Sequence, residues 1–169
     1  ERYCEKSGRL AEPMLLMLDR VTAAQPQGGS KELGFYRAEK DVDPNEWFFK
    51  AHFFQDPVQP GSLGLEALLQ LLQFAMLHKG LDEGLDEPRF EALALDEPIS
   101  WKYRGQVLTH NDTITSTLEI KEIREEDGAI LALGEGSLWV DGMRIYHSTN
   151  VGMRLVAGGK PLLTAETDD

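Results

Sequence analysis

The longest helical pattern in the chain covers residues 62–78. Leucine and other apolar residues fall on nearly every face of this stretch, which predicts a helix buried on almost all sides. Ser62 is a suitable N-cap after Pro60-Gly61, and Gly80 is a suitable stop. A helix of this kind needs other elements around it, because it has no broad polar face to turn to water.

The second half of the chain shows the patterns of β-strands. The strand-like runs cover residues 99–108, 112–124, 129–140 and 143–155. In the second run Ile114, Leu118 and Ile120 share one face, while Glu119 and Lys121 point to the other. Residues 125–128 (EEDG) and the pair Asp141-Gly142 are typical of tight turns between antiparallel strands.

The first half adds two further strand predictions. Residues 14–21 form a short apolar run typical of a strand or the start of one, and residues 33–42 are strand-like. Between them, residues 23–31 are polar and rich in turn formers. Residues 81–88 are predicted to form an acidic loop after the helix.

These elements predict one α+β domain in which an antiparallel sheet curls around a long central helix. The chain of 169 residues is long enough for one sizeable core. We expect the domain to cover residues 14–156, with residues 1–13 as an N-terminal extension and residues 157–169 as a tail or linker. The absence of an initiator Met suggests a domain excised from a longer chain.

Charge and composition exclude several functions. The net charge of −12 argues against nucleic acid and against an anionic membrane as a main partner. The single cysteine, Cys4, allows no disulfide within the chain and no cysteine-rich metal site, and the histidines lack metal-ligand spacing. No dinucleotide fingerprint and no apolar signal segment is present, so we expect a cytoplasmic protein with neither metal nor cofactor.

His52 is the first candidate for chemistry. It lies among aromatic residues just before a turn that Pro57 and Pro60 mark. An imidazole buried among rings is kept neutral and can then act as a base near pH 7. Taken alone, the same pattern also fits a histidine with a purely structural role in the core.

Glu66 and Gly61 are the other candidates, at the start of the predicted helix. The helix dipole favours an ionised carboxyl at Glu66, whereas the surrounding leucines oppose the charge, and a proton donor needs such a balance. Gly61 lacks a side chain, so a ligand carbonyl could approach the free N–H groups where the helix begins. The alternative for Glu66 is a charged residue on a solvent-facing edge, and the alternative for Gly61 is a simple turn with a helix cap. A nucleophilic role for Ser62 is disfavoured, because its surroundings do not match G-x-S-x-G.

Residues 52–66 (HFFQDPVQPGSLGLE) resemble the active-site segment of the hot-dog β-hydroxyacyl-carrier-protein dehydratases of the FabA type. The FabA-like dehydratase domains of polyunsaturated fatty acid synthases look especially similar. Further segments carry the likeness from about residue 14 to residue 155: MLLMLDRV (14–21), DPNEWFF (43–49), YRGQVL (103–108) and WVDGMRIY (139–146).

The resemblance implies a hot-dog fold and a dimer, of two identical chains or with a second hot-dog domain, whose active site is shared. His52 would come from one protomer and Glu66 from the other. A backbone carbonyl, which maps to Val58, would hold the histidine. The N–H of Gly61 would bind the thioester oxygen, and Gln70 would lie one helical turn from Glu66, near the site.

The reaction implied is dehydration of a (3R)-3-hydroxyacyl thioester to the trans-2-enoyl thioester, without a cofactor. The substrate would be linked through phosphopantetheine to an acyl carrier protein. FabA-type enzymes usually have Asp where this chain has Glu66, whereas Glu is the choice of the FabZ type. The resemblance therefore leaves isomerisation of the 2,3 double bond open.

Other functions of hot-dog proteins remain as alternatives. An acyl thioesterase could use a carboxylate and a water, and His52 would then be dispensable. A non-catalytic hot dog could bind acyl chains or complete a partner's dimer. Carrier proteins are usually acidic, so docking to this chain would need a local basic patch, for which the candidates by composition are Lys50, Lys102, Arg104, Arg144 and Arg154.

Overall fold

The computed structural model describes residues 8–126 and 128–158. Along the chain its elements are β1 (Arg20–Gln25), β2 (Phe35–Asp41), α1 (Trp47–Ala51), α2 (Gly61–His78), β3 (Arg89–Phe90), β4 (Ser100–Tyr103), β5 (Thr113–Glu126), β6 (Ala129–Val140) and β7 (Met143–Val156). Most of the predicted extension and tail, namely residues 1–7 and 159–169, lies outside the described residues, as does Asp127 in the predicted turn.

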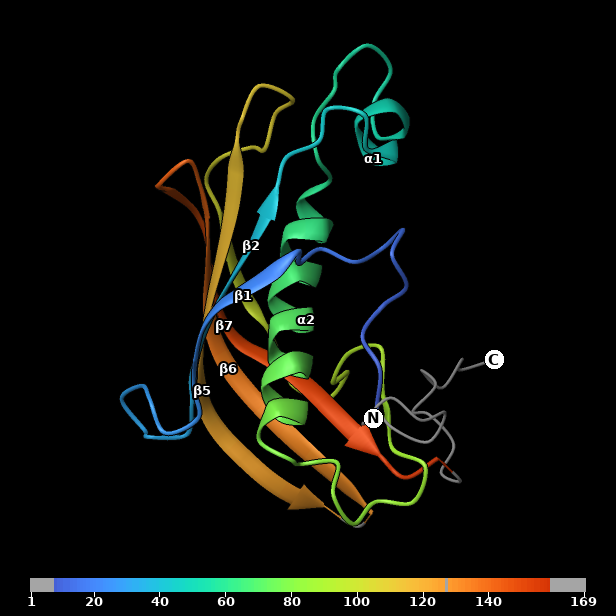
Figure 1. Ribbon diagram of the computed structural model, residues 1–169, viewed down its shortest axis with the longest axis vertical. Coiled ribbons are helices and arrows are strands. Elements are labelled where there is room, and N and C mark those ends of the chain that lie inside the picture. The colour runs from blue at the N-terminus through green and yellow to red at the C-terminus, as the bar shows by residue number, and fades with distance from the viewer. Residues whose placement is uncertain (1–7, 127, 159–169) are drawn as a thin grey trace.

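The strands form one antiparallel sheet in the order β1-β2-β5-β6-β7-β3, and β4 also pairs with β7. The sheet curls around α2, as Figure 1 shows. Bulges bend its long strands: the register shifts at Ile120/Glu122 in β5 and twice between β6 and β7. Because a bulge increases local twist and bends a strand, these shifts help the sheet to wrap around the helix.

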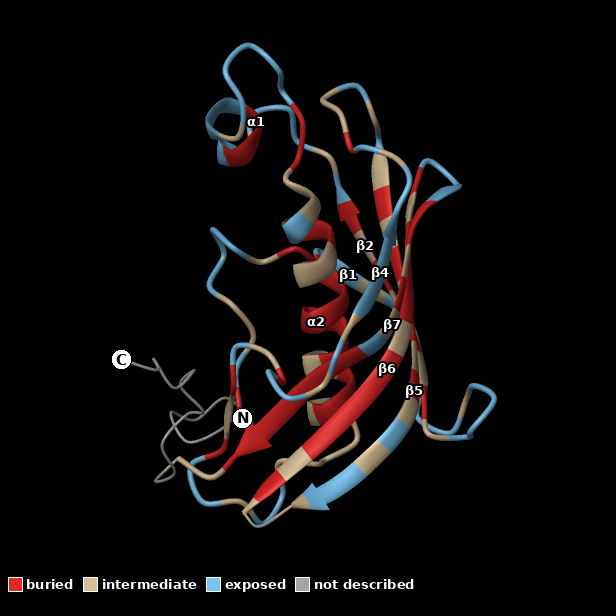
Figure 2. Ribbon diagram, turned by 180° about the vertical axis from the view of Figure 1, so that it is seen from behind, coloured by how far each residue is buried: buried red, intermediate tan, exposed pale blue. Residues whose placement is uncertain are grey.

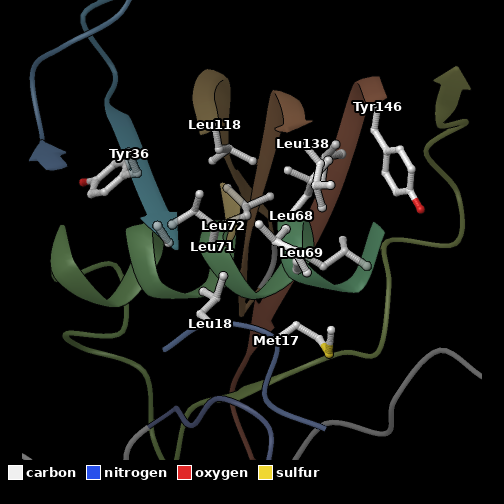
Figure 3. Close-up of a cluster of buried hydrophobic side chains, with 14 of the residues drawn as sticks. Met17, Leu18, Tyr36, Leu68, Leu69, Leu71, Leu72, Leu118, Leu138 and Tyr146 are labelled. Atoms are coloured by element: carbon white, nitrogen blue, oxygen red, sulfur yellow. The ribbon is translucent and has the colours of Figure 1, made fainter. Parts of the chain in front are cut away.

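Helix α2 is the centre of the core. Leu68, Leu71 and Leu72 are fully buried, and the inward side chains Leu118 of β5 and Leu138 of β6 face them from the sheet (Figure 3). This arrangement confirms the predicted α+β architecture with an antiparallel sheet around a long helix. In the described part of the chain, no helix is both long and apolar enough to cross a bilayer.

The segment before β1 differs from the prediction of a strand over residues 14–21. The ladder of β1 begins only at Arg20. Met17 and Leu18 are instead buried against the side of α2 that faces away from the sheet (Figure 3). The backbone N–H of Met17 donates to the side chain of Gln70 rather than to a neighbouring strand. We call residues 15–18 the leading strap, because this segment closes the open side of the helix.

The turn between β1 and β2 also lies later than predicted. Strand β1 continues to Gln25, so the connection covers residues 26–34 rather than 23–31. Residues 81–88 form a series of turns after α2, as expected.

Ser62 is not the N-cap of α2, contrary to the prediction. The helix begins at Gly61, Pro60 occupies the cap position with an extended ψ of 132°, and no side chain caps the helix. The carbonyl of Pro60 accepts a hydrogen bond from the N–H of Leu63, at 3.0 Å. Proline has the fixed φ that suits the residue just before a helix, which explains the earlier start. The predicted stop is confirmed, since Lys79 caps the helix and Gly80 follows in a left-handed conformation.

The strand predictions of the second half are largely confirmed. Strands β5, β6 and β7 match the predicted runs, and the Asp141-Gly142 turn has both residues at positive φ, as a two-residue hairpin requires. The run over residues 99–108 forms only the short strand β4. Its last part instead makes an isolated bridge between Leu108 and Val58.

An ion cluster around a buried guanidinium fixes the end of β7. The guanidinium of Arg154, only 4% exposed, contacts Glu91, Asp96 and Glu126 at 2.7–3.2 Å. These carboxylates come from residues next to β3, from the loop after it and from the end of β5. Arg154 is therefore an internal structural cation, and it is wrong as a candidate for a docking surface.

Candidate active site

His52 follows directly after the short helix α1 and caps its C-terminal end. Its Nδ1 lies 3.0 Å from the carbonyl oxygen of Val58, across the turn. Because a carbonyl only accepts hydrogen bonds, Nδ1 carries the hydrogen, and the neutral ring then presents an unprotonated Nε2. Val58 is itself held by its bridge to Leu108, so the turn has a firm backbone support.

The surroundings of His52 are less closed than the sequence suggested. The imidazole is half-buried and contacts the ring of Phe53, with ring centroids 3.9 Å apart. Phe48 and Phe49 belong to the core, but Trp47, Phe53 and Phe54 are exposed, Phe54 to 91%. The expected aromatic burial of His52 is thus only partly present in one chain, and a large apolar surface remains open beside it.

Glu66 lies on α2 with Gln70 one turn further along the helix. The amide Nε2 of Gln70 donates to Oε1 of Glu66 at 2.8 Å. Gln70 is fully buried, and it also spans to the leading strap: its Oε1 accepts from the N–H of Met17, and its Nε2 donates to the carbonyl of Leu15. These two backbone partners fix the orientation of the Gln70 amide. The N–H of Met17 must face the amide oxygen, and the carbonyl of Leu15 must face the amide nitrogen.

This orientation restricts the chemistry of Glu66. Oε1 of Glu66 must accept a hydrogen bond, since the group that faces it is the NH₂ of Gln70. A proton on this carboxyl group therefore belongs on the other oxygen, Oε2. The half-buried carboxyl group is held in one orientation with one oxygen free to donate.

Replacing Gln70 by Leu is expected to lower the free energy of unfolding by about 1–3 kcal/mol, because it leaves the buried N–H of Met17 and the part-buried carbonyl of Leu15 without their partner. Urea unfolding of the purified chain would measure this change. Gln73→Leu is the matched control: Gln73 is half-buried one turn away, and within the described residues the hydrogen bond of its amide goes to the sulfur of Met153, at 3.7 Å. Equal losses in the two variants would contradict the role of Gln70 as a bridge.

Gly61 is the first residue of α2, where helical N–H groups lack partners within the helix. Aromatic rings come close to it: a Cβ at this position would lie 3.2 Å from Trp101 and 3.3 Å from Tyr103, both on β4. One turn on, a Cβ at Gly64 would clash with the ring of Tyr146. The start of the helix therefore depends on glycine for its contact with these rings.

The structure brings His52 together with Val58, and Glu66 together with Gln70. Among the described residues, no hydrogen bond or ion pair joins His52 to Glu66 of the same chain. The described residues also include no group of three or more His, Cys, Asp or Glu side chains that could hold a metal ion.

Sequence reasoning missed two parts of this region. One is the cluster of Trp101, Tyr103 and Tyr146 over the start of α2, whose rings lie 5.1–5.8 Å apart. The alternation of aromatic and basic residues at 101–104 was the available signal. The other is helix α1, which is too short for a helical period to be visible in the sequence.

The architecture is that of the hot-dog fold, and solved structures share it. The ApeI:P dehydratase heterocomplex from Xenorhabdus doucetiae matches with a TM-score of 0.57 and 13% identity, over 89% of this chain and 88% of that one. A thioesterase from Haemophilus influenzae matches with a TM-score of 0.50 and 12% identity, over 78% and 76% of the two chains. At these identities the likeness concerns the fold alone, and it confirms the predicted hot dog.

The sequence comparisons define the family more closely. The family model described as the FabA-like domain matches residues 10–149. One component of a polyunsaturated fatty acid synthase from Thraustochytrium sp. is 35% identical over 143 residues, which are 83% of this chain and 9% of that protein. The chain belongs to the FabA-like family of hot-dog dehydratases, as its motif predicted. It spans only a small part of the length of this relative.

Proposed function

We propose that this chain dehydrates (3R)-3-hydroxyacyl thioesters on an acyl carrier protein to trans-2-enoyl thioesters, in fatty acid or polyunsaturated fatty acid synthesis. Membership of the FabA-like family supports a dehydratase. The observation that carries the proposal is the hydrogen bond from Nδ1 of His52 to the carbonyl of Val58, since it leaves Nε2 as a base. The relative in a polyunsaturated fatty acid synthase supports the fatty acid context.

In the proposed reaction, Nε2 of His52 takes a proton from C2 of the substrate. The electron pair of that C–H bond forms the C2–C3 double bond, and the C3–O bond breaks. Oε2 of Glu66 gives its proton to the departing hydroxyl, which leaves as water. Transfer of a proton from the imidazolium back to the carboxylate then resets the pair.

Gly61 is proposed to stabilise the enolate that develops during proton removal. A free N–H at the start of α2 can donate to the thioester oxygen, aided by the positive end of the helix dipole. Gln70 supports the acid by holding Oε1 of Glu66. The reaction needs no further group, so we propose no metal and no cofactor.

We further propose that each active site is shared between two hot-dog chains. Two observations support this: Phe53 and Phe54 are exposed beside His52, and β4 is exposed along its whole length (Figure 2). An open strand edge with aromatic side chains suits pairing with a second sheet. A second chain could cover these surfaces and bring its own Glu66 towards His52.

Product analysis tests the reaction. The chain would be incubated with 3-hydroxyacyl N-acetylcysteamine thioesters of graded length, and the products identified by mass and by double-bond position. We expect the trans-2-enoyl thioester and water. Release of free acid without an enoyl product would instead indicate a thioesterase, and binding without turnover would indicate a non-catalytic hot dog. A 3-enoyl product would add isomerisation to the activity.

Mixing two inactive variants tests whether the site is shared. His52→Ala and Glu66→Gln are each expected to be inactive alone. If the variants are unfolded together and refolded as an equal mixture, half of the dimers contain both variants, and one of their two sites has both native residues. About a quarter of the wild-type activity should then return. No recovery, with mixed dimers shown by mass spectrometry, would contradict a site built from two chains.

A further inference from the structure

A basic groove lies on the face of the sheet opposite to α2. It has a volume of about 580 Å³, and it is lined by Lys102, Arg104, Trp139, Arg144 and His147 together with Ile145 and Tyr146. The strand pairing explains this placement: Lys102 of β4 lies opposite His147 of β7, which lies opposite Ser137 of β6. Neighbouring residues in register point to the same face, so these side chains share one surface.

The opposite face of the same strands points towards the helix. Tyr103 of β4 pairs with Tyr146 of β7, and Tyr146 pairs with the buried Leu138 of β6. The rings of Tyr103 and Tyr146 lie against Gly61 and Gly64 at the start of α2. The groove and the proposed oxyanion site are therefore separated only by the thickness of one strand layer.

A bulge brings Arg144 into the groove. In a regular strand Arg144, two residues before Tyr146, would share its helix-facing side. The register shifts here, however, so that Arg144 pairs with Trp139 and Ile145 is the extra residue. The guanidinium of Arg144 lies over the indole of Trp139, 5.7 Å from the ring centroid. Bulges re-aim side chains in this way, and this one completes the basic surface.

The lysine and arginine side chains of the groove have no carboxylate partner among the described residues. Lys102, Arg104 and Arg144 make no ion pair and no side-chain hydrogen bond there. Other cations of the sheet are each paired with carboxylates, namely Arg20, Arg37, Lys40, Lys121, Arg124 and Arg154. One acid borders the groove: Glu135 lies 3.6 Å from Nε2 of His147 and 3.7 Å from Nζ of Lys121. In a chain of net charge −12, this groove is a local concentration of uncompensated positive charge.

We propose that this groove is the docking surface for the acidic face of an acyl carrier protein. The inference rests on the proposed dehydratase function, because that function calls for such a partner. Electrostatic complementarity selects this surface on an otherwise acidic chain, where other faces would repel an acidic protein. A carrier protein docked here would lie one strand layer away from the start of α2, where the proposed site begins.

The test compares two substrates with the same acyl group. One is a 3-hydroxyacyl chain on a purified acidic carrier protein, and the other is the same chain on uncharged N-acetylcysteamine. In the variant Lys102→Glu/Arg144→Glu we expect kcat/KM on the carrier protein to fall about tenfold or more. Turnover of the small thioester should stay within about twofold, since neither residue belongs to the catalytic machinery. Added salt should lower the carrier-protein rate of the wild type and have little effect on that of the variant.

Lys31→Glu/Lys79→Glu is the matched control, with the same charge change. Lys31 is in the β1–β2 turn, and Lys79 follows the far end of α2 from Gly61. An equal loss in the control would overturn the proposal, because net charge rather than the groove would then matter. Equal losses on both substrates would overturn it as well. A loss on the carrier protein and on a coenzyme A thioester alike would assign the groove to phosphate and not to a protein surface.

Binding measurements separate this inference from the proposed function. If the wild type turned over neither substrate, the dehydratase proposal would fail while docking could still be measured. Calorimetric titration of the wild type and of the groove variant with the carrier protein would then decide. Weaker binding by the groove variant than by the control supports the docking surface, and equal binding overturns it.

Discussion

Replacing His52 by Ala is expected to lower kcat/KM for dehydration by about 10²–10⁴, because the reaction loses its proposed base. Hydration of a trans-2-enoyl thioester is the reverse reaction and can be followed by the loss of enoyl absorbance. The same loss is expected in both directions, since one group removes and returns the C2 proton. His110→Ala is the control: this exposed histidine lies in the loop before β5.

A near-normal rate in His52→Ala would show that the assignment of the base is wrong. It would also favour a thioesterase mechanism, in which a carboxylate and a water suffice. The unfolding transition of the variant should stay close to that of the wild type, because the half-buried imidazole contributes one hydrogen bond across its turn. A loss of activity can then be assigned to chemistry and not to unfolding.

Replacing Arg154 by Met is expected to lower the free energy of unfolding by about 3–5 kcal/mol, because it removes the buried cation of an ion cluster that includes the buried carboxylate of Glu91. Glu91 is itself buried at the centre of this cluster, and Arg154 contacts it at 3.2 Å. Thermal or urea unfolding would measure the loss. The comparison variant is Arg20→Met, whose guanidinium also contacts two carboxylates but lies at an exposed position. There we expect a much smaller loss, because water screens an exposed ion pair.

The effect of Arg154 should also depend on pH. Its hydrogen bond holds the pKa of Asp96 below the usual value. A carboxyl whose pKa is lowered by folding contributes stability above its unfolded-state pKa and loses that contribution as the pH falls towards its folded-state pKa. The difference between wild type and Arg154→Met should therefore shrink as the solution is acidified below about pH 4. A difference that grows on acidification would contradict the assignment.

The long elements could be predicted because their patterns are local. An all-round apolar run predicts a buried helix, and alternation predicts the strands β5, β6 and β7. Residues 14–18 carry an equally apolar pattern, yet they form no strand. Their place is decided by contact with α2 and by the hydrogen bonds of Gln70, some fifty residues away in sequence. A local pattern does not contain such a partner.

The site shows the same division between residues that a local pattern identifies and residues whose place depends on long-range contacts. His52, Gly61 and Glu66 stand in one continuous motif, and the resemblance of that motif named them. Arg144 and Arg154 looked equivalent as charges in the sequence. In the structure the register of β7 sends Arg154 into an internal cluster, whereas the bulge at Ile145 turns Arg144 to an open surface. Strand register is a long-range property, so composition could not separate the two.

Gln70 joins the proposed acid to the leading strap, and this has a consequence for anyone who moves this domain into another protein. Trimming the module to its first strand would discard Leu15 and Met17 and leave the amide of Gln70 free to turn. The carboxyl of Glu66 would then lose its alignment although every residue of the motif were still in place. A transplanted unit should therefore begin upstream of Leu15, so that the chain segment that orients its acid travels with it.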